Sequence, residues 1–139
     1  MKYLAIDYGT KRTGIAVSDP DGKLAFPRSV IQTSSALVAD LVAVILKESC
    51  YEIILGRSIN AKGEKNPVMV PIEKLKSDLE VRGYTVTYED ERYSSMQAAR
   101  EQGENDMHDA STAAVILQGF LDRQHRAPLE NDPYAPRPE

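Results

Sequence analysis

The chain has 139 residues, of which 42% are hydrophobic and 27% are charged, and its formal net charge is -4. This length predicts one domain with a core that needs no structural metal or disulfide, and the single cysteine, Cys50, excludes an intramolecular disulfide and favours a reducing compartment. The negative charge argues against a protein that coats nucleic acid. No apolar stretch is long enough to span a bilayer and no signal peptide pattern is visible, so we expect a cytoplasmic protein without a membrane partner.

The first part of the chain alternates short apolar runs with turn residues. Tyr3–Ile6 and Thr13–Ser18 are predicted strands, and the sequence Asp-Pro-Asp-Gly at Asp19–Gly22 is typical of a turn. Leu24–Ile31 is then expected to pair back as a third strand. Because proline cannot donate a hydrogen bond to a neighbouring strand, Pro27 places this strand at an edge of the sheet.

Helices and strands alternate in the rest of the chain. The expected elements are a helix capped by Ser34 or Ser35, a strand at Glu52–Leu55, a helix with Pro71 in its first turns and Gly83 at its end, a strand at Tyr84–Tyr88, a short helix at Ser95–Gln102 and a helix at Met107–Arg123. Three antiparallel strands followed by alternating helices and strands (βββαβαβα) predict a mixed α/β sheet with right-handed crossovers. We expect one domain over residues 1–126 and a Pro-rich, disordered tail over residues 127–139.

Acidic residues stand where the predicted strands end. Asp7 ends the first apolar run, Asp90 and Glu91 follow the fifth predicted strand, and Asp109 precedes the small-residue face of the last helix. Ligands in open α/β sheets bind at the carboxyl ends of strands, so we expect these acids to gather there. Converging carboxylates repel one another, and Mg²⁺ or Mn²⁺ relieves that repulsion while accepting oxygen ligands.

Each acid taken singly has a simpler explanation as a turn former, a helix-start charge or a surface ion pair. Their joint placement favours a metal site, at which two ions can activate water and stabilise the leaving oxygen of a phosphodiester. The residues alone do not decide between Asp90 and Glu91.

Four blocks of sequence carry a family resemblance: AIDYGTKRTGIAVSD, NAKGE, DERYSS and DASTAAVILQGFLD. In order and spacing, from about residue 2 to about residue 122, they resemble the YqgF/RuvX family. The resemblance implies an RNase H-like fold shared with the RuvC resolvases, and either Holliday junction resolution in DNA recombination or processing of the 5′ end of pre-16S rRNA in ribosome biogenesis. It also implies that Asp7, Glu91 and Asp109 are the catalytic, metal-binding acids of a Mg²⁺ or Mn²⁺ site with two ions.

The chain departs from the family pattern at a few positions. It has Gly56, Arg57 and Ser58 where the family commonly has Gly-Leu-Pro, and Ser95 and Thr112 replace Thr and Ala. No carboxylate is lost, but the changed loop bears on substrate preference.

Glycines, a hydroxyl and cations are expected to handle substrate phosphates. The predicted nucleic-acid-binding residues are Gly9, Thr10, Lys11, Arg12, Asn60, Gly63 and Arg92. Similar Asp-Gly-Thr turns occur in sugar kinases and actin-like ATPases, but those proteins close two domains around a nucleotide, whereas this chain has the length of one. Two weaker candidates stand near Asp109. Asp106, three residues earlier, could share its helical face and give a fourth ligand, and His108 could carry a proton or contact a phosphate, although a structural or solvated role explains a lone histidine at a helix start better.

Three functions are compatible with these residues. The first is a Mg²⁺- or Mn²⁺-dependent nuclease, a hydrolase acting on branched DNA or precursor rRNA. The second is a non-catalytic RNA- or ribosome-associated binding module with the same fold, and the third is a small phosphatase or nucleotide hydrolase. A resolvase cuts two symmetric strands, so a homodimer is one expectation. The sequence leaves open DNA or RNA as substrate, and endonuclease or exonuclease action.

Overall fold

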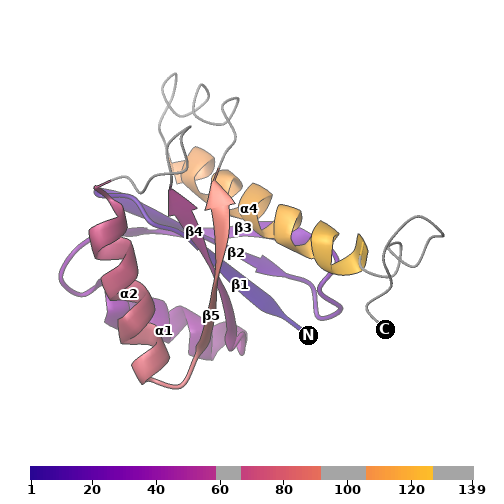
Figure 1. Ribbon diagram of the computed structural model, residues 1–139, viewed down its shortest axis with the longest axis horizontal. Helices are drawn as coiled ribbons and strands as arrows, with labels where there is room; N and C mark the ends of the chain where they lie inside the picture. Colours follow the sequence, from indigo (N-terminus) through magenta and orange to yellow (C-terminus); the bar gives the residue numbers. More distant parts are fainter. Residues whose placement is uncertain (59–66, 92–105, 127–139) are drawn as a thin grey trace.

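The computed structural model describes residues 1–58, 67–91 and 106–126, and these residues form one α/β unit (Figure 1). In chain order its elements are β1 (Tyr3–Asp7), β2 (Arg12–Ser18), β3 (Ala25–Gln32), α1 (Leu37–Glu48), β4 (Glu52–Ser58), α2 (Met69–Val81), β5 (Thr85–Glu91) and α4 (Asp106–Arg126). The predicted α/β class and the order βββαβαβα are confirmed. The short helix expected at 95–102 and the tail expected at 127–139 lie outside the described residues.

The five strands form one mixed sheet in the order β3-β2-β1-β4-β5. β1 and β2 are antiparallel, as are β2 and β3, which makes the first three strands a meander with β3 at the edge, as Pro27 predicted. β1 runs parallel to β4, and β4 runs parallel to β5. The carboxyl ends of β1, β4 and β5 therefore lie side by side, at the end of the sheet that carries Asp7.

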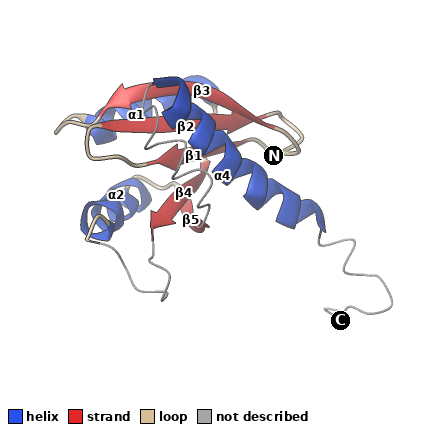
Figure 2. Cartoon of the chain, turned by 90° about the horizontal axis from the view of Figure 1, so that it is seen from above, coloured by secondary structure: helices blue, strands red, loops and turns tan. Residues whose placement is uncertain are grey.

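Helices cover both faces of the sheet: α1 and α2 lie on one face and α4 lies on the other (Figure 2). Side chains alternate between the faces, so that Leu4 and Ile6 of β1 pack toward α1 and α2, whereas Ala5 packs toward α4. Alanines at Ala5 and Ala16 let α4 approach the sheet closely. No helix in the described part of the chain is both long and apolar enough to cross a membrane.

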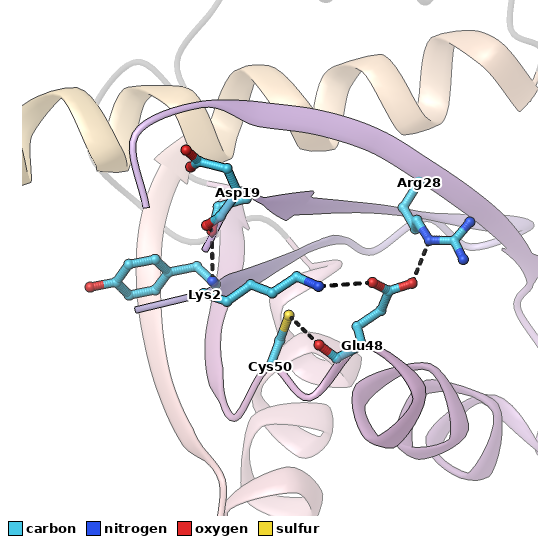
Figure 3. Close-up of polar contacts among 7 residues, drawn as sticks. Lys2, Asp19, Arg28, Glu48 and Cys50 are labelled. Atoms are coloured by element: carbon cyan, nitrogen blue, oxygen red, sulfur yellow. Dashed lines mark hydrogen bonds and ion pairs between the residues drawn. The ribbon is translucent and has the colours of Figure 1, made fainter. Parts of the chain in front are cut away.

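The opposite end of the sheet is held by a polar cluster (Figure 3). Glu48 at the end of α1 accepts hydrogen bonds from Arg28 of β3 at 2.5 Å and from Lys2 at 3.3 Å, and these two cations lower the pKa of its carboxyl, Arg28 more strongly. Cys50 is buried, donates to the carbonyl of Glu48 at 3.5 Å, and has its thiol pKa raised by burial. It is therefore a structural thiol.

Two strands are longer than the sequence predicted. β4 was expected to end at Leu55 and β5 at Tyr88, but backbone pairing continues to Ser58 and Glu91, which lie opposite each other. The acids at the end of β5 are consequently part of a strand and do not follow it. A polar end of a strand carries no apolar signal, which explains the shorter prediction.

The start of α1 also differs from the prediction. Ala36 is the N-cap residue and no side chain caps the helix, whereas Ser34 or Ser35 was expected to do so. The hydroxyl of Ser34 instead accepts a hydrogen bond from the backbone N–H of Ala36 at 3.1 Å, in a turn that precedes the helix.

Candidate active site

Asp7 is a buried carboxylate at the carboxyl end of β1. Only 6% of it is exposed, and it lies opposite Gly14 of β2. Because Ala5 packs toward α4 and Ile6 toward the other helices, strand alternation places Asp7 on the α4 face. Its carboxylate oxygens are ligands of the kind that Mg²⁺ and Mn²⁺ accept.

The two neighbouring acids of β5 belong to different faces of the sheet. Asp90 accepts a hydrogen bond from Nε of Arg57 at 2.7 Å, and the guanidinium of Arg57 also lies 5.5 Å from the ring centre of Tyr88. Tyr88 packs with the core on the α1 and α2 side. Position 91 alternates with Asp90 and therefore belongs to the α4 face, where Asp7 lies. This register favours Glu91 over Asp90 as a metal ligand, which the residue pattern alone left open.

A third acid of β5, Glu89, was not singled out from the sequence. It is 5% exposed, and Arg123 of α4 forms an ion pair with it. Glu89 lies opposite Gly56 of β4, on the α4 face of the sheet. Alternation along Thr85–Glu91 puts positions 89 and 91 on the opposite face from Asp90, and this pattern in the sequence could have identified Glu89. Because Arg123 neutralises Glu89, we regard the pair as a tether between β5 and α4.

The first turn of α4 lies at the end of the molecule toward which β4 and β5 point (Figure 1). Asp109 precedes Thr112 and Ala113 by three and four residues, and both are buried. The helical repeat therefore places position 109 in line with residues that face the sheet. The side chains of residues 106–109, including the weaker candidates Asp106 and His108, lie outside the described part of the structure.

The loop after Asp7 is tightly closed. A Cβ atom at Gly9 would lie 2.2 Å from the carbonyl oxygen of Arg12, so only glycine fits there. The hydroxyl of Thr33 donates to the carbonyl of Gly9 at 2.7 Å, and the backbone N–H of Thr33 donates to the carbonyl of Lys11 at 2.9 Å. Behind it, the buried hydroxyl of Thr13 is 2.7 Å from that of Thr33.

This loop presents polar side chains to solvent at the edge where Asp7 lies. Thr10 and Lys11 are exposed and Arg12 is half-buried at the start of β2. Thr33 holds the loop from the end of β3, and no sequence motif identified it. Four of the predicted phosphate-binding residues, Gly9, Thr10, Lys11 and Arg12, are thus brought beside Asp7.

Other predicted site residues are not placed. Asn60, Gly63 and Arg92 lie outside the described residues, as do the side chains of Glu91 and Asp109. Among the described residues no three metal-ligating side chains come together, and Asp7 is the one predicted ligand whose side chain is included. The three-acid metal site therefore stays a prediction, supported by the position of Asp7 and the register of β5.

Comparisons with known proteins agree with this architecture. Residues 1–123 match the family model described as "RuvX: Holliday junction resolvase". Proteins named "Putative pre-16S rRNA nuclease" from Oleidesulfovibrio alaskensis and Maridesulfovibrio salexigens are 35% and 34% identical; the alignments cover 94% and 88% of this chain and 99% of each relative.

Solved structures show the same fold at low sequence identity. RuvC of Thermus thermophilus has a TM-score of 0.55 and 13% identity, with 90% of this chain and 96% of that chain covered. The Fowlpox virus resolvase in complex with Holliday junction DNA has a TM-score of 0.57 and 11% identity, with coverage of 89% and 99%. These neighbours identify the fold as that of the RNase H-like resolvases. The family model and the two relatives at 35% and 34% identity show that the chain belongs to the RuvX family of Holliday junction resolvase-like proteins.

Proposed function

We propose that the protein is a Mg²⁺- or Mn²⁺-dependent endonuclease that cleaves phosphodiester bonds in structured nucleic acid, either branched DNA or precursor 16S rRNA. The observation that carries the proposal is Asp7, a carboxylate only 6% exposed at the strand edge where β4, β5 and the start of α4 also end or begin. The names of the relatives and the Holliday junction complex of a structural neighbour support a nucleic acid substrate.

The donor set fits a hard divalent cation. Asp7 offers carboxylate oxygens in a buried position, and the proposal adds Glu91 from the same face of the sheet and Asp109 from α4. Two ions held there would supply a water of lowered pKa and positive charge for the leaving oxygen.

The chain itself would bind and orient the phosphate. Lys11 is exposed and Arg12 is half-buried beside Asp7, so that both can approach a phosphate that reaches this edge. Thr33 donates hydrogen bonds to the carbonyls of Gly9 and Lys11 and so holds the loop in place. This reduces the conformational entropy that the loop loses when substrate binds. Arg92, Asn60 and Gly63 are proposed to complete the substrate contacts.

The test is a substrate panel with Mn²⁺: a four-way DNA junction, duplex DNA, single-stranded DNA and precursor rRNA. Asp7→Asn, Glu91→Gln and Asp109→Asn are each expected to lower cleavage by at least 100-fold. Asp90→Asn is the matched control, because it also removes one carboxylate from β5 but affects an ion pair with Arg57 on the other face. Equal losses in Asp90→Asn and Glu91→Gln would contradict the assignment.

The other outcomes separate the alternative functions. Binding of RNA without cleavage, and without Mn²⁺ uptake in calorimetry, would favour the non-catalytic binding module. Turnover of mononucleotides in place of polymers would favour a phosphatase. The preferred substrate in the panel decides between DNA and RNA. We also propose that the protein acts in the cytoplasm, and as a homodimer if it resolves junctions, which light scattering at working concentration tests.

A further inference from the structure

A pocket of about 180 Å³ lies on the α1 and α2 side of the sheet, close to the edge that carries Asp7. Its walls come from the end of β1, the connection between β3 and α1, the first turn of α1, and α2. The side chains that line it are Tyr8, Thr33, Ser34, Ser35, Leu37, Val38, Pro71, Lys74, Leu75 and Asp78. The site residues described above do not use it, apart from Thr33.

The size of the pocket limits what it can hold. An apolar cavity of about 150 Å³ binds benzene, so a pocket of about 180 Å³ admits one ring system and excludes a duplex. Leu37, Val38 and Leu75 offer apolar walls, and Tyr8 adds an aromatic ring. A planar ring system with an apolar face and polar edges matches such walls.

The rim of the pocket is polar. Ser34 and Ser35 are exposed and carry hydroxyls that can donate to or accept from the edge of a base. Lys74 forms an ion pair with Asp78 at 3.1 Å, but its side chain is 75% exposed, so this pair is weak and its ammonium can also reach a phosphate. Unpaired bases are recognised by stacking on aromatic side chains and by hydrogen bonds to their edges, and the pocket offers Tyr8 for the first and the two serine hydroxyls for the second.

The pocket and the candidate active site are adjacent along the chain. Tyr8 follows Asp7 directly, and it packs with the core on the α1 and α2 side, whereas Asp7 lies on the α4 face. Thr33 lines the pocket and also donates a hydrogen bond to the carbonyl of Gly9, in the loop after Asp7. Because Asp7 and Tyr8 face opposite sides of the sheet, a nucleic-acid strand with its phosphate at Asp7 would pass around the carboxyl end of β1 to place a neighbouring base at Tyr8.

We propose that this pocket receives one unpaired nucleobase of the nucleic acid, next to the phosphate that is cut. The position of that phosphate rests on the proposed function; the recognition of a single base rests on the pocket. DNA and RNA present the same ring systems, so either nucleic acid can supply the base.

The proposal is tested with fluorescently labelled duplexes that carry one unpaired nucleotide, each compared with the same duplex carrying an abasic residue at that point. DNA and RNA versions are measured by anisotropy with the full chain. Stacking on protein side chains strengthens binding by about 5- to 150-fold per base, so the wild type is expected to bind the base-containing probe at least 5-fold more tightly. The nucleic acid, DNA or RNA, that shows the larger difference in affinity between base-containing and abasic probes is the one whose sugar the protein prefers.

Filling the pocket should remove this preference. In Ser35→Phe the base-containing and abasic probes are expected to bind equally, while affinity for a fully paired duplex stays as in the wild type. Ala43→Phe, an exposed position on α1 that does not line the pocket, is the control and should keep the preference. If Ser35→Phe has a lowered melting temperature, Ser34→Phe replaces it, since Ser34 is exposed and lines the same pocket.

Equal binding of base and abasic probes by the wild type would overturn the proposal, and so would an unchanged preference in both filled variants. The result is independent of cleavage. Base preference that is lost only in the filled variants supports the pocket even if no probe is cut, an outcome that would overturn the proposed nuclease alone. Cleavage without base preference would overturn the pocket alone.

Discussion

Replacing Thr33 with valine tests how the loop after Asp7, which is proposed to bind phosphate, is held in place. Thr33 donates its hydroxyl proton to the carbonyl of Gly9, so the 2.7 Å contact with Thr13 must have Thr13 as the donor. Valine keeps the branched shape and the backbone bond to Lys11 but removes the oxygen between these two partners. The substitution therefore isolates one hydroxyl.

The expected loss of stability follows from the burial of the two partners. Gly9 is half-buried, so water can replace part of its bond, and the loss is about 1 kcal/mol. Thr13 is fully buried, and a buried hydroxyl without a partner costs about 1–3 kcal/mol. Thr33→Val should thus lower the free energy of unfolding by about 2–4 kcal/mol.

Urea unfolding measures this change, with two variants as controls. Thr33→Ser keeps the hydroxyl and should restore most of the stability. The double variant Thr13→Val/Thr33→Val leaves no buried hydroxyl without a partner, so it should be more stable than Thr33→Val alone, with a coupling of about 1–2 kcal/mol. Affinity for the preferred nucleic acid should fall in Thr33→Val and recover in Thr33→Ser, because the loop that carries Lys11 loses its support.

Two results would refute the reasoning. A stability of Thr33→Val within about 0.5 kcal/mol of the wild type would mean that the chain contains no such support. Equal behaviour of the valine and serine variants would mean that shape, and not the hydroxyl, matters at position 33.

Three further predictions concern single positions. Gly9→Ala places a Cβ 2.2 Å from the carbonyl oxygen of Arg12, so the loop must open, and we expect about 1–3 kcal/mol lower stability and weaker nucleic acid binding; tolerance of alanine in both assays would contradict this. Glu48→Gln should lower the free energy of unfolding by about 1 kcal/mol at pH 7, since it removes the charge that pairs with Arg28. Because Arg28 lowers the pKa of Glu48, this stabilisation is present above the usual pKa of 4.5 and is lost as pH falls through the lowered pKa. Melting temperatures between pH 2 and 7 should show a flatter acid limb in the variant, and superimposable curve shapes would reject that linkage. Cys50 should react with a thiol reagent at pH 8 only on unfolding, because burial raises its pKa; rapid labelling of the native protein would show otherwise.

The sequence predicts the fold well where apolar runs are bounded by turn residues. Tyr3–Ile6 and Thr13–Ser18 were placed within one residue of the strands found, and the turn at Asp19–Gly22 forms with Gly22 at a positive φ of 69°. Asp19 accepts hydrogen bonds from the backbone of Lys23 and Leu24 in this turn. These features are local, and local chemistry decides them.

Features that depend on the partner strand were predicted less well. The extension of β5 through Glu91 needs the pairing with β4, and the roles of Glu89 and Asp90 follow from which face each occupies. Alternation over seven residues carries that information, but only once the strand is known to continue through its acids. The hydrogen bond from Thr33 to the loop after Asp7 joins residues far apart in sequence, and no sequence motif predicts it.

The acidic net charge is compatible with phosphate binding because the basic side chains are not equally available. Six of those that the structure describes form ion pairs with acids: Lys2, Arg28, Arg57, Lys74, Lys76 and Arg123. These pairs join elements of the fold or lie on the surface of α2. Because each cation is balanced by an acid, the pairs contribute little net positive potential at the edge where Asp7 lies. Lys11, by contrast, is exposed on the loop beside Asp7. Binding through a few local cations makes affinity for nucleic acid in general modest, since each neutralised phosphate contributes separately to counterion release. Discrimination between substrates must then come from shape and from single bases, which is the role proposed for the pocket behind Tyr8.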